Sequence, residues 1–184
     1  ITDIGVDQYG QAFAQCTNLR SLKLPNSLEQ IGSMTFARCT SLQNISLPPN
    51  LYFIGEDAFY KCTSLGNFTL PSGLLYIDMQ AFDECTGLTH MTFPSSVRTI
   101  GESAFLKCVN LTEVTFPEDS IAAIESAAFA STGLSSVYLP SGVTFRGYSD
   151  YPSEQQFGYI FIKVGHFTKR SDFKIITDSK DTAA

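Results

Sequence analysis

The sequence of 184 residues contains no tryptophan, only two histidines and no C-x-x-C pair of cysteines. Two histidines leave few candidates for general acid–base or nucleophilic catalysis, and without a C-x-x-C pair the common signature of a structural zinc site is missing. No stretch approaches the roughly 20 apolar residues of a membrane-spanning helix. The first ten residues also lack the basic and then apolar pattern of a secretion signal, so the sequence reads as trimmed at its start.

Positive charge is scarce as well. Twelve Lys and Arg stand against 18 Asp and Glu, which gives a net charge of −6. Proteins that neutralise the phosphates of nucleic acids or of anionic lipids need the opposite balance, so neither class of partner is expected. The composition is 43% hydrophobic, and this length is enough for one domain with a buried core.

What the sequence does contain is an internal repeat of 23 residues. All five cysteines keep this interval, and so do six of the eight prolines and a column of leucines. The fifth unit departs from it, because three of its apolar residues fall one position late. The register then recovers, until Arg146 stands where an isoleucine is expected. The cysteines are Cys16, Cys39, Cys62, Cys85 and Cys108, and the prolines are Pro25, Pro48, Pro71, Pro94, Pro117 and Pro140.

Each unit alternates between patterns typical of short extended segments and of turns. Residues 22–24 and their equivalents have alternating apolar and polar side chains, which predicts a strand with one buried face. A proline then ends the strand, because it has no amide proton for the ladder. Leu28 and Ile31 predict a second, shorter extended piece, followed by Gly32. Asp78 replaces this glycine in one unit, which suggests a backbone with positive φ at that position.

The segment 58–65 spaces its apolar residues three apart, which predicts one short helical or 3₁₀ turn. A small residue precedes the phenylalanine of each unit, so that the backbone can approach a neighbouring unit while the ring enters the core. No unit of this size buries its own apolar face. We therefore expect the units to stack at about 4.8 Å per coil and to share one continuous core about 30 Å long.

The motif L-x-x-L-x-L-P-x-x-L-x-x-I-G-x-x-A-F-x-x-C resembles the BspA-like, or treponemal-type, leucine-rich repeats over residues 10–143. The resemblance implies a repeat solenoid of the α/β type, mostly β with short helical or 3₁₀ turns, right-handed and with a parallel sheet along one side. It also implies a surface or secreted protein of host-associated bacteria or parasitic protists. It implies no cofactor and no catalytic residue, because members of this family share core positions only.

Two regions follow from the repeat. Residues 1–145 are expected to form the solenoid, with about six units of which the first and last are incomplete. Residues 146–184 are expected to cap its open end, with strands at 159–164 and 173–177 and a frayed tail. His166 lies in this second region, and the sequence identifies no partner for it.

The repeated cysteines suggest small apolar core residues. A column spread along the solenoid axis cannot converge on one metal ion, and parallel side chains one coil apart are badly aimed for disulfides. We therefore expect five buried free thiols and no metal site. The carboxylate pairs at 56–57, 83–84 and 118–119 lie at different places in the unit, which indicates a role in solubility.

The outward positions of the strands are the candidate binding surface. Most of these side chains are short and polar, and aromatic residues occupy the adjoining second extended piece. Polar residues around a core position also produce N-x-S/T sequons at Asn44, Asn67 and Asn110, and nothing in the sequence decides whether they are glycosylated. The candidate residues are Asn67, Thr69, His90, Thr92, Glu113, Thr115 and Tyr138 on the sheet, with Tyr52, Phe53 and Tyr76 on the adjoining edge.

These patterns favour a non-catalytic module that binds a protein or a glycan, for adhesion or host interaction, on a secreted or cell-surface protein. Nucleic acid and membrane insertion are not expected, and a monomer is favoured. His90 beside Glu113 is interpreted as a solvated pair, because no nucleophile or oxyanion hole accompanies it. The alternative function is a structural spacer that holds another domain away from the cell surface and binds nothing itself.

Overall fold

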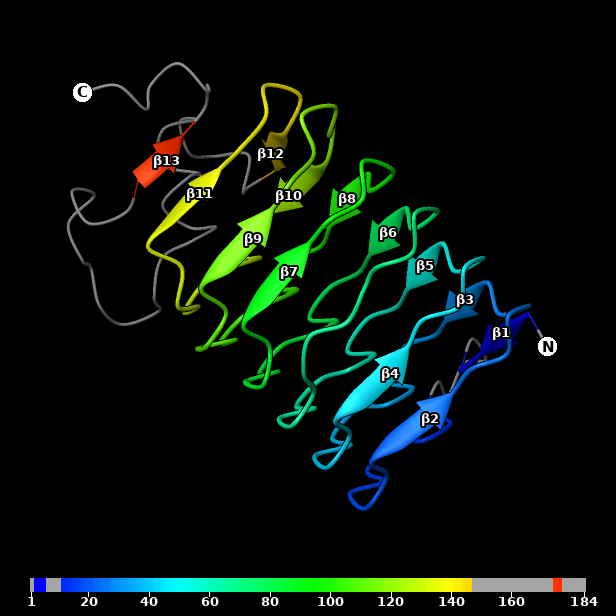
Figure 1. Ribbon diagram of the computed structural model, residues 1–184. Coiled ribbons are helices and arrows are strands. Elements are labelled where there is room, and N and C mark those ends of the chain that lie inside the picture. Colours follow the sequence, from blue (N-terminus) through cyan, green and yellow to red (C-terminus); the bar gives the residue numbers. More distant parts are fainter. Residues whose placement is uncertain (1, 6–10, 147–173, 177–184) are drawn as a thin grey trace.

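The computed structural model describes residues 2–5, 11–146 and 174–176. The chain forms a stack of parallel coils, each with two short extended segments and a series of turns (Figure 1). This confirms the predicted repeat solenoid with parallel sheets. In the part of the chain that the structure describes, no helix is long and apolar enough to cross a membrane. The strand predicted at 159–164 and His166 lie outside the described residues, so the cap stays a prediction.

The continuous sheet of the molecule lies on the second extended segment of each unit, which the sequence suggested to be the minor one. Seven short parallel strands pair here in sequence order. One residue is added in the fifth unit, because Ile124 pairs with Ile100 at an offset of one more than the repeat. The strands are β1 (Asp3–Ile4), β3 (Gln30–Ile31), β5 (Phe53–Ile54), β6 (Tyr76–Ile77), β8 (Thr99–Ile100), β10 (Ala123–Glu125) and β12 (Thr144–Arg146).

The end of this sheet corrects the predicted end of the repeat. The register at Arg146 predicted that the array stops after Val143. Instead, β12 pairs with β10, and Phe145 takes the place opposite Ile124. Phe145 packs against the core although it stands one residue before the expected position. The chain therefore completes one more extended segment than its spacing predicts.

The first extended segment of each unit forms a second, interrupted layer (Figure 1). Its strands are assembled in three parallel pairs, β2 with β4, β7 with β9, and β11 with β13. Residues 67–69, the equivalent of a strand in the third unit, have no strand assignment. The strands are β2 (Ser21–Lys23), β4 (Asn44–Ser46), β7 (His90–Thr92), β9 (Glu113–Thr115), β11 (Ser136–Tyr138) and β13 (Lys174–Ile176).

The segments predicted as helical or 3₁₀ turns are successive tight turns without helix assignment in the described residues. Their amides alternate between two directions. Ala37 N donates to Met34 O in its own coil, whereas Phe36 N donates 2.8 Å to Ala58 O in the next coil. This alternation requires left-handed backbone at two positions in each unit, such as Met34 and Arg38. Eleven residues other than glycine therefore have positive φ, which bonds to the next coil offset.

The repeated glycines serve close packing of coils, which corrects the predicted positive φ. Gly5 is the glycine with positive φ among the described residues, and Asp78 does not have one either. A Cβ atom at Gly55 would lie 2.8 Å from the nitrogen of Ser33, and one at Gly101 would lie 2.7 Å from the carbonyl carbon of Asp78. Side chains are excluded at these two positions because the backbone of the preceding coil already fills the space.

Phenylalanine and cysteine columns form the centre of the core. The rings of Phe36, Phe59 and Phe82 stack with centroids 5.2 and 5.1 Å apart. Each buried cysteine reaches back one coil, as where Cys62 Sγ donates to Phe36 O over 3.1 Å. The same column of stacked rings continues through Phe13, Phe36, Phe59, Phe82, Phe105 and Phe129.

The thiol column corrects one expectation. Cys39, Cys62, Cys85 and Cys108 are buried and free, as predicted, but Cys16 is exposed. Cys16 lies at the start of the stack, where the described residues contain no preceding phenylalanine carbonyl to receive it. Burial raises the pKa of the Cys62 thiol to about 12.

Truncation of the central ring tests the stacked core. Phe59→Ala should lower the free energy of unfolding by about 3 to 5 kcal/mol, because it leaves a cavity between two rings in a fully buried column. Chemical denaturation measures the loss. The half-buried Phe53→Ala is the matched control and should cost less. A loss below about 1 kcal/mol for Phe59→Ala would place the ring outside the core.

Thiol titration tests the cysteine column. In the native protein one thiol, Cys16, should react promptly with a disulfide reagent, while four react slowly until the protein is unfolded. A thiol with a raised pKa stays protonated at neutral pH and is a poor nucleophile. Cys16→Ser should remove the fast phase alone. Prompt reaction of three or more native thiols would contradict the burial of this column.

Candidate interaction surface

The outer face consists of β2, β4, residues 67–70, β7, β9 and β11. Strand alternation places the central residue of each strand in or against the core and the flanking residues outward, as predicted. Asn67, Thr69, Thr92 and Thr115 are exposed. Tyr138 is half-buried, and its hydroxyl donates 2.9 Å to Glu118 Oε2. The predicted sheet residues therefore share one polar surface.

The ladder of this face opens at residues 67–70, which we name the gap segment. None of its four residues makes a backbone–backbone hydrogen bond within the described chain, whereas the preceding Gly66 N still donates 3.0 Å to Gln43 O. Phe68 occupies a core column that holds smaller or more flexible side chains elsewhere, Leu22, Ile45, Met91, Val114 and Val137. Its ring packs against Phe82 with centroids 5.6 Å apart and remains half-buried. The bulk of this ring accounts for the outward position of the backbone.

The Asn67 side chain bridges the opening toward the next coil. Its Oδ1 accepts hydrogen bonds from the amides of Thr89 at 2.9 Å and His90 at 3.1 Å. Its Nδ2 lies 2.7 Å from Thr89 Oγ1 and 2.9 Å from His90 Nδ1. An amide donor at this nitrogen requires the lone pair of Nδ1, so the proton of the neutral ring is on Nε2. One side chain thus replaces the backbone ladder.

His90 and Glu113 are cross-strand neighbours in β7 and β9, as the sequence predicted. Both are exposed. The ring of His90 nevertheless has its hydrogen bonds on the opposite side, with Asn67 and Thr89 of the preceding part of the stack. The two residues therefore belong to a solvated polar surface, and this arrangement does not pair a base with a nucleophile.

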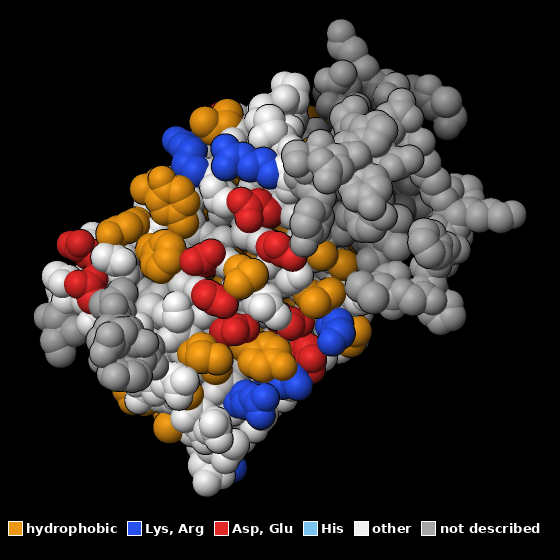
Figure 2. Space-filling model, turned by 180° about the vertical axis from the view of Figure 1, so that it is seen from behind, with side chains coloured by type: hydrophobic (Ala, Val, Ile, Leu, Met, Phe, Trp, Pro, Cys, Tyr) orange, Lys and Arg blue, Asp and Glu red, His pale blue; other side chains and the backbone are white. Residues whose placement is uncertain are grey.

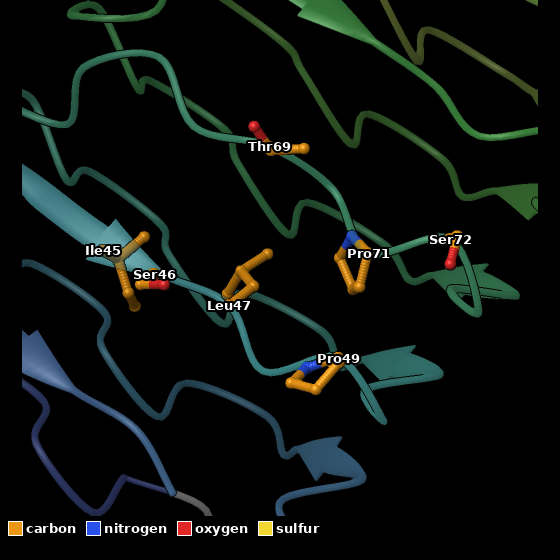
Figure 3. A pocket seen from close by; sticks show the side chains of 7 residues that line it. All are labelled: Ile45, Ser46, Leu47, Pro49, Thr69, Pro71 and Ser72. Carbon is orange, nitrogen blue, oxygen red and sulfur yellow. The ribbon is translucent and has the colours of Figure 1, made fainter. Parts of the chain in front are cut away.

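A groove follows the opening from the gap segment to the proline corner between the two sheets (Figure 3). It has a volume of about 410 Å³, and all of its lining side chains are uncharged. One wall comes from the coil of β4 and the other from the coil of the gap segment. The lining residues are Ile45, Ser46, Leu47 and Pro49 on the first wall and Thr69, Pro71 and Ser72 on the second.

The predicted aromatic edge lies on the same two coils, immediately beyond the proline corner. Phe53 and Tyr76 are directly paired in the register of β5 and β6. Tyr76 is 41% exposed, while Phe53 and Tyr52 are half-buried. Aromatic side chains with accessible surface are common anchors of protein interfaces. Groove and aromatic edge are therefore successive parts of one pair of coils.

The reverse face has a different character, with acidic side chains gathered in its middle and basic ones at its margins (Figure 2). Glu84 lies 3.5 Å from Lys61 Nζ and 3.3 Å from Lys107 Nζ, so that it joins three coils. Among the described residues, no group of His, Cys, Asp or Glu is arranged to hold a metal ion. The acidic side chains of this face therefore stand as a charged surface and not as a metal site.

Asp83 is the buried member of this face. It is 3% exposed, and its Oδ1 has no hydrogen-bond partner. Burial raises the pKa of its carboxyl group to about 6, and Glu84 adds to the effect, while Lys107 opposes it. Sequence reasoning interpreted the pair 83–84 as a solubility feature. The available signal was the column, since Asp83 stands where other units have Ala37, Tyr60 and Leu106.

Neutralising this carboxylate should stabilise the protein. The folded pKa of Asp83 lies above its model value of 3.8, so the folded state binds the extra proton and stability falls as the pH rises from about 4 to 6. Asp83→Asn should raise the free energy of unfolding at pH 7.5 by up to about 3 kcal/mol, and this gain should vanish near pH 4. Asp119→Asn, an exposed position, is the control for the loss of one charge. Equal effects of both substitutions would contradict the burial of Asp83.

Comparison with known proteins follows the same geometry. A sequence profile of the BspA type leucine rich repeat region matches in six copies, over residues 8–135 and 53–162. No curated protein matches the sequence. A leucine-rich repeat protein of T. pallidum is 29% identical with a TM-score of 0.65, and the match covers 79% of this chain and 69% of that one.

Two further solved structures are similar. A leucine rich cell surface protein of Faecalibacterium prausnitzii A2-165 is 30% identical with a TM-score of 0.58, and the match covers 73% of this chain but 36% of that one. A leucine-rich repeat protein of Bacteroides ovatus ATCC 8483 shares the fold, with 20% identity, a TM-score of 0.52 and coverage of 96% and 55%. On the repeat register, the coil geometry and the six matched copies, the chain belongs to the BspA-type leucine-rich repeat family.

Proposed function

We propose that this chain is a macromolecule-binding module of a surface or secreted protein, which serves adhesion or host interaction. The aromatic edge carries the proposal, because Phe53 and Tyr76 pair across β5 and β6 and Tyr76 is exposed. Two adjacent aromatic side chains of this kind provide the large contact area in which binding energy is usually concentrated. The short polar side chains of the outer face would add complementarity around this anchor.

The scaffold favours binding over catalysis. Leucine-rich repeats are in general non-catalytic scaffolds that bind proteins, and each coil here displays side chains at fixed spacing on a rigid core. The F. prausnitzii relative is a cell surface protein, which supports the same location for this chain. This chain corresponds to about a third of that relative, 36% of its length, so the partner and the location of the whole protein belong to the proposal.

Binding to immobilised extracellular-matrix proteins, mucins and glycans tests this function. Phe53→Ala with Tyr76→Ala should weaken binding of the retained ligand about tenfold or more, about 1.4 kcal/mol, since the anchor is removed. Surface plasmon resonance gives the dissociation constants. The melting temperature of each single variant shows whether the fold is kept.

Tyr60→Ala is the matched control, because Tyr60 lies on the turn segments, near Arg38 and Lys61. It should leave binding unchanged. Undiminished binding of the Phe53 and Tyr76 variants would place the contact elsewhere on the solenoid. If no ligand of the panel is retained by the wild-type protein, the spacer function is favoured instead.

A further inference from the structure

The gap segment exposes a row of main-chain groups that a parallel sheet would normally pair. Residues 67–70 have no backbone–backbone hydrogen bond on either side within the described chain. Toward the following coil, the Asn67 side chain already binds the amides of Thr89 and His90. Toward the preceding coil, the opening is the groove along β4. Unpaired N–H and C=O groups at a strand edge are a template for another extended chain.

The lining of the groove restricts the chemistry of such a chain. Ser46, Thr69 and Ser72 offer hydroxyl groups, while Leu47 and the prolines offer apolar surface (Figure 3). None of the lining side chains carries a charge. A segment with small, uncharged side chains fits this lining, because a charged group would lose hydration here without an opposite charge to compensate for it.

We propose that the groove binds an extended peptide segment with small, uncharged side chains, which pairs through its main chain with residues 67–70. The proposal specifies the partner of the binding function proposed above and rests on it. The peptide lies between the coil of β4 and the gap segment and reaches the proline corner at Pro49 and Pro71. From there it continues toward Phe53 and Tyr76, which belong to the same two coils.

The protein itself shows that this layer accepts an added strand. Lys174–Ile176, far along the chain from the repeats, forms β13 and pairs in parallel with β11 of the outer face. The pairing is in register with Ser136–Tyr138. An extended segment without the repeat motif is therefore sufficient to join the layer. The gap segment differs in that it presents its unpaired groups in the middle of the stack.

Closing the opening is the sharpest test. Phe68→Ile restores a side chain like that of Ile45 in the preceding coil, so the ladder should close and the fold should be kept. Wild-type protein is used to select displayed random peptides of about six residues, the usual length of a strand. Enriched peptides should bind Phe68→Ile about tenfold more weakly or worse, by fluorescence anisotropy. Val114→Ile changes the same core column away from the groove and should bind as the wild type does.

Main-chain pairing gives a second readout. Amides of residues 67–70 should exchange rapidly in the free protein and become protected when an enriched peptide is added. Methylation of alternate backbone nitrogens in the same peptide should abolish binding, because it removes donors but keeps every side chain. Protection of these amides in the free protein would contradict an open ladder and overturn the proposal.

The remaining outcomes separate this proposal from the broader function. Equal peptide binding by wild type and Phe68→Ile, or failure to enrich any peptide, rejects the groove as a peptide site. Retention of glycans and not of peptides, lost in Phe68→Ile, also rejects it and assigns the groove to carbohydrate. In each case, loss of partner binding on substitution of Phe53 and Tyr76 would still support the binding module.

Discussion

The distance at which phenylalanine rings stack sets the geometry of the whole solenoid. Paired strands repeat at about 4.8 Å, and the rings of successive coils have centroids 5.1 to 5.5 Å apart. Both spacings must be met in every coil, one at the sheets and the other in the core. The backbone has to come close enough for this, which is why Gly55 and Gly101 contact the preceding coil directly. The cysteine thiols fit because they bind the carbonyl of the preceding phenylalanine without adding bulk.

Against this constraint, the gap segment is a local conflict between two aromatic residues. Phe68 and Phe82 meet at a tilted angle of 33° within a core whose main column is otherwise stacked nearly parallel. The continuous sheet behind them stays paired, since β5 and β6 keep their register. The strain is therefore relieved where the chain is free to move outward, on the outer face. An opening of this kind keeps the stack intact and still gives one coil pair a distinct surface.

The sequence was sufficient for whatever the period alone determines. The 23-residue register predicted the buried columns, the strand faces and the pairing of His90 with Glu113. It could not predict the opening at Phe68, because a phenylalanine is a normal core residue and the conflict arises only from its fit against Phe82 in three dimensions. The exposure of Cys16 and the burial of Asp83 likewise depend on what lies in the neighbouring coil. Glycine roles were misjudged because close approach and positive φ have the same residue preference.

The turn segments give the molecule an electrical direction. On this side, Met34, Phe36 and Arg38 donate their amides to Glu56, Ala58 and Tyr60 of the next coil, and the following coils repeat the same sense. Peptide dipoles, each of about 3.5 D, add up when they are aligned, whereas the dipoles of an ordinary sheet largely cancel. The stack therefore carries partial positive charge toward its C-terminal end and partial negative charge toward its N-terminal end. Anionic groups are favoured beside the last coil and cations beside the first, although no helix is present in the described residues to produce this polarity.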